Sequence, residues 1–132
     1  MPKTILVVDD DPQFLAALTP LLWEAGFTTI TAKDGKEAEA KLQGGVVIDG
    51  AIVDLELPEV GGFQVIAKIC AAGDKSLPVV AVTGAYSDLY LEVAEFLGAK
   101  ISIRKPPPGR SLARLVEAIE SAMSGPKTAT PV

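Results

Sequence analysis

Five short apolar runs alternate with segments of helical spacing along this 132-residue chain. The runs are rich in Val and Ile and are too short for buried helices, so they predict strands. They lie at residues 4–8, 28–32, 51–53, 78–82 and 101–103. Apolar residues at helical spacing follow each run, and a glycine ends most of these segments, as at many helix ends. This alternation predicts an α/β fold with a parallel sheet and helices on both of its faces.

The strand order decides which side chains meet at the strand ends. We expect a doubly wound, five-stranded sheet in the flavodoxin-like order 2-1-3-4-5. The first and third strands are neighbours in that order, and open sheets of this kind bind ligands beside the carboxyl ends of such strands. The chain has no internal repeat, so we expect one domain over residues 1–123 and a flexible tail at residues 124–132.

Carboxylates follow the two strands that we expect to be neighbours. The run at residues 51–53 ends at Asp54, and the first run ends at Asp9 and Asp10. An isolated aspartate after a strand commonly caps the next turn, and Asp54 alone would be interpreted in that way. Because the strand order brings all three carboxylates to one edge of the sheet, we expect them to share a pocket instead.

Two further polar residues follow the fourth and fifth strands at the same edge. Taken alone, Thr83 is explained as a strand-end hydroxyl and Lys105 as a solvated loop lysine. Their joint placement beside three carboxylates favours a functional role. Carboxylates that lie so close repel one another unless a cation lies among them or one of them carries a proton.

Phosphoryl transfer is the chemistry that suits this set of residues. Mg²⁺ prefers oxygen ligands and fits sites where a phosphate supplies further oxygens. Asp54 could act as the nucleophile towards a phosphoryl donor and form an acyl phosphate. The metal and the Lys105 ammonium would neutralise charge on the transferring group, and the Thr83 hydroxyl could donate a hydrogen bond to it.

Composition argues against several other classes of protein. The formal net charge of −5 disfavours a broad face for nucleic acid, and the lack of histidine excludes His-based catalysis and a phosphohistidine carrier. No apolar run is long enough to cross a bilayer, and the N-terminus does not resemble a signal peptide. The single cysteine, Cys70, cannot form an internal disulfide. We therefore expect a cytoplasmic protein that binds neither nucleic acid nor membrane directly.

Four segments hold the candidate residues in a fixed order. They are Ile5-Leu6-Val7-Val8-Asp9-Asp10-Asp11-Pro12, Asp54-Leu55-Glu56-Leu57-Pro58 with Gly62, Val80-Ala81-Val82-Thr83-Gly84, and Gly98-Ala99 with Lys105-Pro106. Over residues 3–123, this ordered set resembles the receiver domains of response regulators in two-component signalling, such as the chemotaxis receivers. Each segment alone is a weak signal, whereas the four in order are highly specific.

The resemblance implies a phosphoacceptor and a metal site. Asp54 would accept a phosphoryl group from a histidine kinase or a phosphotransfer protein. Mg²⁺ would be the cofactor, bound by Asp10 and Asp54, by Asp9 mainly through water, and by the backbone carbonyl of Glu56. The chain would then perform only its own phosphorylation and dephosphorylation, and we expect no dedicated enzymatic turnover of a substrate.

The resemblance also implies how the signal is passed on. Thr83, Gly84 and Lys105 would contact the phosphoryl group, and the Lys105–Pro106 bond would be cis. Ser102 stands where the family usually has an aromatic residue, so the usual inward rotation of that ring cannot operate.

The same comparison with the family locates the surface for a downstream protein. That partner would bind the face built from the expected helix at 89–97, the strand at 101–103 and the helix at 112–119. A homodimer is a further option for the chain.

Other functions stay open on the sequence alone. A Mg²⁺-dependent phosphohydrolase would also use Asp54, with Glu56 as its general acid, although the chain has no insertion that would cap a substrate pocket. A phosphate sink or relay intermediate shares the receiver chemistry and differs only in its partners. A scaffold with a degenerate site is disfavoured because every expected site residue is present. The chain could be a stand-alone receiver or a piece of a longer protein.

Overall fold

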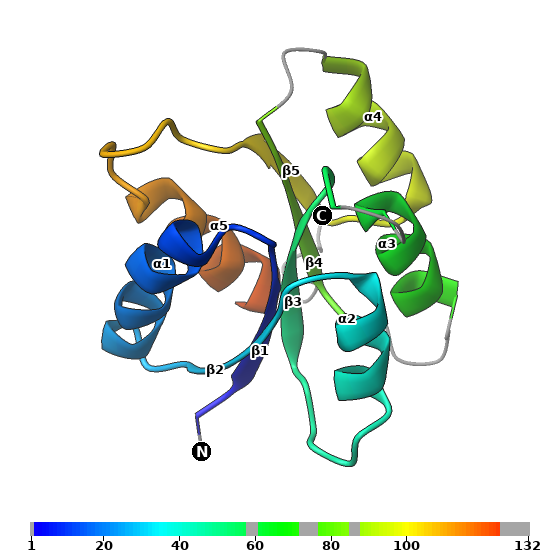
Figure 1. Ribbon diagram of the computed structural model, residues 1–132, viewed down its shortest axis with the longest axis horizontal. Helices are drawn as coiled ribbons and strands as arrows, with labels where there is room; N and C mark the ends of the chain where they lie inside the picture. Colours follow the sequence, from blue (N-terminus) through cyan, green and yellow to red (C-terminus); the bar gives the residue numbers. More distant parts are fainter. Residues whose placement is uncertain (1, 58–60, 72–76, 85–87, 125–132) are drawn as a thin grey trace, which may run out of the picture.

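The fold is one parallel sheet with helices on both faces (Figure 1). The computed structural model describes residues 2–57, 61–71, 77–84 and 88–124. Across these ranges the five strands have the order β2-β1-β3-β4-β5, which confirms the predicted fold class and strand order. The strands are β1 (Thr4–Val8), β2 (Thr28–Ala32), β3 (Gly50–Asp54), β4 (Val79–Thr83) and β5 (Ile101–Arg104).

The helices form two layers on the sheet. One layer consists of α1 (Pro12–Glu24) and α5 (Ala113–Ser124), and the other of α2 (Gly35–Leu42), α3 (Gly62–Ala71) and α4 (Asp88–Leu97) (Figure 1). A separate buried cluster lies beneath each layer. The two clusters together make up the hydrophobic core of the described chain.

The central strands β3 and β4 are buried along their whole length. Successive side chains of a strand point to opposite faces of its sheet. Ala51 and Val53 accordingly pack in the cluster beneath α2, α3 and α4, whereas Ile52 packs in the cluster beneath α1 and α5. Because both faces are covered, β3 needs apolar residues at every position until it ends at Asp54.

A capped helix follows directly after β1. Asp11 Oδ1 accepts a hydrogen bond from Gln13 N at 3.0 Å, and Pro12 occupies the first turn, as predicted for this helix start. The connection from β1 to α1 is therefore short. It keeps Asp9 and Asp10 beside the end of the strand.

The C-terminal boundary differs by one residue from the expectation. Helix α5 includes Ser124, which was expected to begin the tail. The rest of that expected tail, residues 125–132, lies outside the described residues, as do Pro58 of the second quoted segment and residues 85–87. Among the helices that are described, none has the length and apolar character needed to cross a membrane.

Helix α3 begins in direct contact with the end of β3. A Cβ added to Gly62 would lie 2.1 Å from the Asp54 carbonyl oxygen and 2.6 Å from Leu55 Cα, which are impossible contacts for a real side chain. A Cβ added to the neighbouring Gly61 would meet nothing within 4 Å. The main chain at Gly62 thus sets how closely α3 approaches the residue that ends β3.

We expect Gly62→Ala to lower the free energy of unfolding by on the order of 1–3 kcal/mol, because the added methyl must push α3 away from β3. Gly61→Ala is the matched control and should be neutral or slightly stabilising, since its methyl has space and Ala restricts the unfolded chain. Urea unfolding of both variants measures the difference. Equal stability of the two variants would contradict the close packing at Gly62.

Candidate functional site

Three carboxylates meet at the edge where the strands have their carboxyl ends, towards the top of Figure 1. Val8 of β1 pairs with Val53 of β3, so Asp9 and Asp54, which follow them, are neighbours. One carboxylate oxygen from each of Asp9, Asp10 and Asp54 lies within 4.8 Å of the other two. Asp9 and Asp54 are buried, whereas Asp10 is exposed and leaves the cluster open to solvent on its side.

Asp9 has one hydrogen-bonded oxygen and one oxygen in an ion pair. Its Oδ1 accepts a hydrogen bond from Asp11 N at 2.9 Å. Its Oδ2 lies 2.9 Å from Lys105 Nζ, but no well-aligned hydrogen bond reaches this oxygen from the described residues. Burial raises the pKa of Asp9 by more than the contact with the Lys105 ammonium and the hydrogen bond from Asp11 N lower it.

Asp54 is held by its own loop and faces the same lysine. Its Oδ1 accepts a hydrogen bond from Glu56 N at 3.0 Å, and its Oδ2 lies 3.7 Å from Lys105 Nζ. Burial raises the pKa of Asp54 to about 6, and the nearby Asp9 charge adds to this effect. The Glu56 hydrogen bond and the Lys105 charge act in the opposite direction.

Lys105 reaches the carboxylates from the end of β5. Its backbone N–H donates to the Thr83 carbonyl at 2.7 Å and so extends the pairing between β4 and β5 beyond Arg104. Its ammonium lies 4.3 Å from the centre of the Phe14 ring on α1, a cation–π contact. Burial lowers the pKa of Lys105, but the close contact with Asp9 and the negative charges of Asp54 and Asp9 raise it by more.

Thr83 and Gly84 complete the rim at the end of β4. Thr83 is fully buried, and Gly84 is exposed. The Gly84 N–H donates a hydrogen bond to Glu56 Oε1 at 3.0 Å. The family resemblance predicts Glu56 as a backbone ligand, and the phosphohydrolase alternative uses it as a general acid, but neither predicts this contact of its side chain.

The expectation of a cis Lys105–Pro106 bond is wrong. No cis peptide bond occurs among the described residues, which include both partners of this bond. The trans form is the intrinsically preferred one for a residue before proline, by about 0.5–1 kcal/mol. The Lys105 ammonium reaches Asp9 from this trans main chain, so the ion pair does not require the cis isomer.

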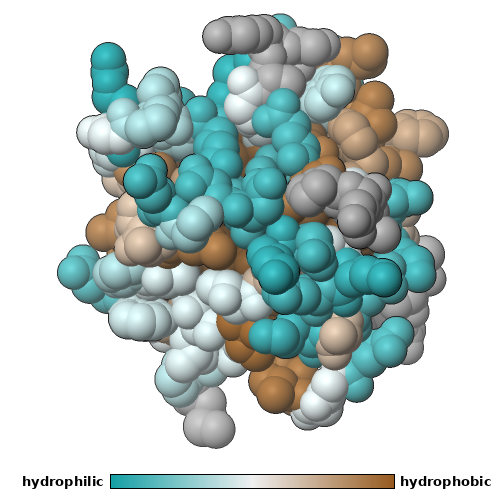
Figure 2. Space-filling view, viewed as in Figure 1, coloured by the Kyte–Doolittle hydropathy of each residue, from teal (hydrophilic) through white to brown (hydrophobic). Residues whose placement is uncertain are grey.

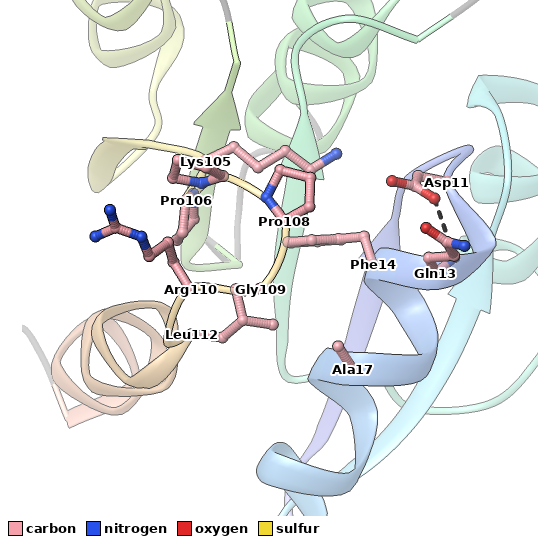
Figure 3. A pocket seen from close by; sticks show the side chains of 11 residues that line it. Asp11, Gln13, Phe14, Ala17, Lys105, Pro106, Pro108, Gly109, Arg110 and Leu112 are labelled. Atoms are coloured by element: carbon pink, nitrogen blue, oxygen red, sulfur yellow. Dashed lines mark hydrogen bonds between the residues drawn. The ribbon is translucent and has the colours of Figure 1, made fainter.

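A pocket of about 240 Å³ lies beside the site, between α1 and the loop that follows β5 (Figure 3). Phe14 projects from α1 towards the proline-rich side of this loop, and Leu112 and Ala17 lie lower in the same view (Figure 3). Lys105 borders the pocket as well. The pocket therefore shares one wall with the carboxylate cluster, and no pattern in the sequence indicated it.

Ser102 lies outside the cluster and connects β5 to α4. Its hydroxyl is within hydrogen-bonding distance of Glu95 Oε2, at 2.6 Å, and of the Leu91 carbonyl, at 3.2 Å. Two residues further along β5, Arg104 forms an ion pair with Asp88 at the start of α4. Polar contacts thus join β5 to α4 in the region where the family usually has an aromatic residue and this chain has Ser102.

The comparisons with known proteins agree with this geometry. The sequence model described as the response regulator receiver domain matches residues 5–120. The response regulator GtcR of Aneurinibacillus migulanus is 33% identical over 116 residues, which are 87% of this chain and 47% of the relative. The Regulator of RpoS of Escherichia coli K12 is 31% identical over 104 residues, or 79% of this chain and 30% of the relative. The chain thus spans less than half the length of these two relatives.

Solved structures show the same fold. A CheY-like response regulator receiver domain protein from Methanospirillum hungatei is 26% identical, with a TM-score of 0.83 over 94% of this chain and 95% of that one. The structure of a CheX–CheY complex with BeF3 and magnesium from Borrelia burgdorferi is 27% identical, with a TM-score of 0.80 over 90% and 87% of the two chains. Together with the match over residues 5–120, these findings show that the chain belongs to the family of response regulator receiver domains of two-component signalling.

Proposed function

We propose that the chain accepts a phosphoryl group on Asp54 from a histidine kinase or a phosphotransfer protein and thereby changes its binding to other proteins. The observation that carries this proposal is the buried Asp54 carboxylate, which shares a lysine with a second buried carboxylate. Receiver domains are in general signalling modules without a dedicated enzymatic activity. The proposal also places the chain in the cytoplasm, where a kinase has access to ATP.

The donor set supports a magnesium site at the cluster. Three carboxylate oxygens lie within 4.8 Å of one another, and one oxygen of the buried Asp9 has only an ion pair and no aligned hydrogen bond from the described residues. Hard oxygen donors with an open side suit Mg²⁺, which keeps several waters when bound. We expect Asp10 and Asp54 to bind it directly, Asp9 mainly through water, and the Glu56 carbonyl to add a ligand. The ion would supply positive charge for the phosphoryl oxygens.

The transfer step follows from the placement of Asp54 and Lys105. An oxygen of Asp54 attacks the phosphorus of the donor phosphohistidine, and the P–N bond breaks with its electron pair returning to the imidazole nitrogen. The Lys105 ammonium, 3.7 Å from Asp54 Oδ2, offsets negative charge on the transferring group. The Thr83 hydroxyl and the Gly84 N–H are the donors that we assign to the phosphoryl oxygens.

The phosphohydrolase alternative is less well supported. It would use the Glu56 carboxyl as a general acid, which must be free to give a proton to the leaving group. Here the Glu56 carboxylate accepts a hydrogen bond from Gly84 N, at the rim of the site. A phosphate sink or relay intermediate remains within the proposal, because it uses the same residues and differs only in its partners.

Two surfaces are suited to the partners. A donor must approach Asp54 across the rim, and the pocket bordered by Lys105 and Phe14 lies on that rim, so we assign it to an apolar side chain of the donor (Figure 3). Apolar residues also gather over α4, at the upper right of Figure 2. Leu89 and Phe96 of α4 are 60% and 88% exposed, and we assign this face to a downstream protein or a second copy of the chain.

The buried Asp54 carboxyl predicts how stability depends on pH in the absence of metal. Because folding raises its pKa from 3.8 to about 6, the folded chain binds the proton more tightly than the unfolded chain between these values. Wild-type stability should therefore fall as pH rises through this window, by up to roughly 3 kcal/mol. Asp54→Asn keeps an oxygen that can accept from the Glu56 N–H, and because its amide does not ionise, its stability should not fall in this pH window.

Urea unfolding in EDTA should show Asp54→Asn more stable than the wild type at pH 7, and the two equally stable near pH 4. Mg²⁺ at ten times its dissociation constant should then stabilise the wild type by about 1.4 kcal/mol at pH 7. A stability difference that does not change with pH would contradict the buried, protonatable state of Asp54. The absence of any stabilisation by Mg²⁺ would contradict the metal site.

Acetyl phosphate with Mg²⁺ should add one phosphoryl group to the wild type, measured by intact mass, and none to Asp54→Asn. Asp49→Asn is the matched control because Asp49 lies next to the opposite end of β3, where it accepts a hydrogen bond from Thr4 N. This control should be labelled like the wild type. Labelling of Asp54→Asn at the wild-type level would show that another residue is the phosphoacceptor.

The role of the pocket can be tested with a substitution that fills it. Ala17→Arg should slow phosphoryl transfer from an autophosphorylated histidine kinase at least tenfold, roughly the effect of 1.4 kcal/mol. Labelling by acetyl phosphate should be unchanged, since this small donor needs no docking surface. Ala16→Arg is the control, because Ala16 is also exposed on α1 but does not line the pocket. Equal transfer rates in the two variants would remove the pocket from the donor interface.

A further inference from the structure

The ends of β3 and β4 are joined by the side chain of Glu56. Its Oε1 accepts a hydrogen bond from Gly84 N at 3.0 Å. A Cβ added to Gly84 would meet the same oxygen at 3.3 Å, so the carboxylate lies directly against this residue. The pairing of Asp54 with Val82 brings the two loops together, and the Leu55 N–H continues it by donating to the Val82 carbonyl at 2.9 Å.

Glu56 contacts both sides of the site through different parts of the same residue. Its backbone N–H donates to Asp54 Oδ1 at 3.0 Å, while its side chain accepts from Gly84. The Gly84 amide directly follows the buried Thr83 and is a donor that the proposed function assigns to a phosphoryl oxygen. In the structure this donor is therefore already bound to an anion that belongs to the chain itself.

Two anions cannot share this donor without a cost. A phosphoryl group on Asp54 would bring further negative charge close to the Glu56 carboxylate, which would repel it. A ligand that makes the same hydrogen bond must also displace the carboxylate from the amide. Any loss of this internal hydrogen bond reduces the free energy gained when the ligand binds.

We propose that the Glu56 carboxylate is an internal competitor for the Gly84 amide, which it occupies until a phosphoryl group on Asp54 displaces it. Glu56 is then a positioning residue that sets how readily the site accepts and keeps a phosphoryl group. This inference rests on the proposed function of Asp54. It adds that the Glu56 carboxylate destabilises the phosphorylated state, because it binds the Gly84 N–H that the phosphoryl group would otherwise bind.

The test uses beryllofluoride with Mg²⁺, a phosphoryl mimic, and two variants at one position. Glu56→Ala removes the acceptor and its charge, whereas Glu56→Gln removes the charge and keeps an oxygen that can accept from Gly84. Both variants keep the backbone N–H that binds Asp54. Because Glu56 is exposed, both variants should fold, and a thermal melt of each checks this.

We expect Glu56→Ala to bind beryllofluoride roughly three- to tenfold more tightly than the wild type, the range of one exposed hydrogen bond. Glu56→Gln should lie between the two, because its neutral oxygen competes more weakly for the amide. Equal affinities of the Ala and Gln variants, both tighter than the wild type, would show that charge repulsion alone is responsible and would overturn the proposal. Glu24→Ala is the control for net charge, since Glu24 is exposed at the C-terminal end of α1, and its affinity should equal that of the wild type.

The Gly84 amide proton provides a second measurement that needs no ligand. In free wild-type protein its NMR resonance should be shifted downfield relative to Glu56→Ala, as expected for an amide bound to a carboxylate. An identical Gly84 resonance in the two free proteins would overturn the proposal whatever the affinities. Failure of the wild type to bind beryllofluoride, with the Gly84 shift present, would instead overturn the function proposed for Asp54 and leave the contact of Glu56 established.

Discussion

The position of the Lys105 ammonium determines how the other polar groups of the site are arranged. Two buried carboxylates, Asp9 and Asp54, face the end of the sheet, and burial raises the pKa of both. Lys105 lies 2.9 Å from the first and 3.7 Å from the second, so it compensates charge that would otherwise oppose folding. It reaches them because the pairing of β4 with β5 continues through the Thr83 carbonyl. The register of the sheet thus fixes the electrostatics of the site.

Features that depend on the main chain and on residue type could be predicted from the sequence. A strand buried on both faces needs a continuous apolar run, and the end of the run therefore marks where polar groups can begin. The topology of parallel sheets then places the ends of neighbouring strands together. These two rules suffice to bring Asp9, Asp10 and Asp54 to one edge, and the structure places all three there.

Features that depend on side-chain conformation or on small energy differences could not be predicted. The two isomers of a bond before proline differ intrinsically by only about 0.5–1 kcal/mol, so the surrounding contacts decide which one forms. Those contacts could not be predicted from the sequence, and the Lys105–Pro106 bond is trans. The contact of Glu56 with Gly84 requires one rotamer of an exposed side chain. Ser102 marked the loss of an aromatic residue, but its hydrogen bond to Glu95 depends on how α4 lies against β5.

The contact between Lys105 and Phe14 affects the entropy of the site. A free lysine side chain carries about 2 kcal/mol of conformational entropy, which a binding partner must normally overcome when it immobilises the ammonium. Here the ammonium is held 4.3 Å from the centre of a buried ring and beside two carboxylates before any ligand arrives. The conformational entropy of the Lys105 side chain is therefore lost when α1 packs against the sheet during folding, and not each time a ligand binds. The fold thus places the cation of this site beside the carboxylates before a ligand binds.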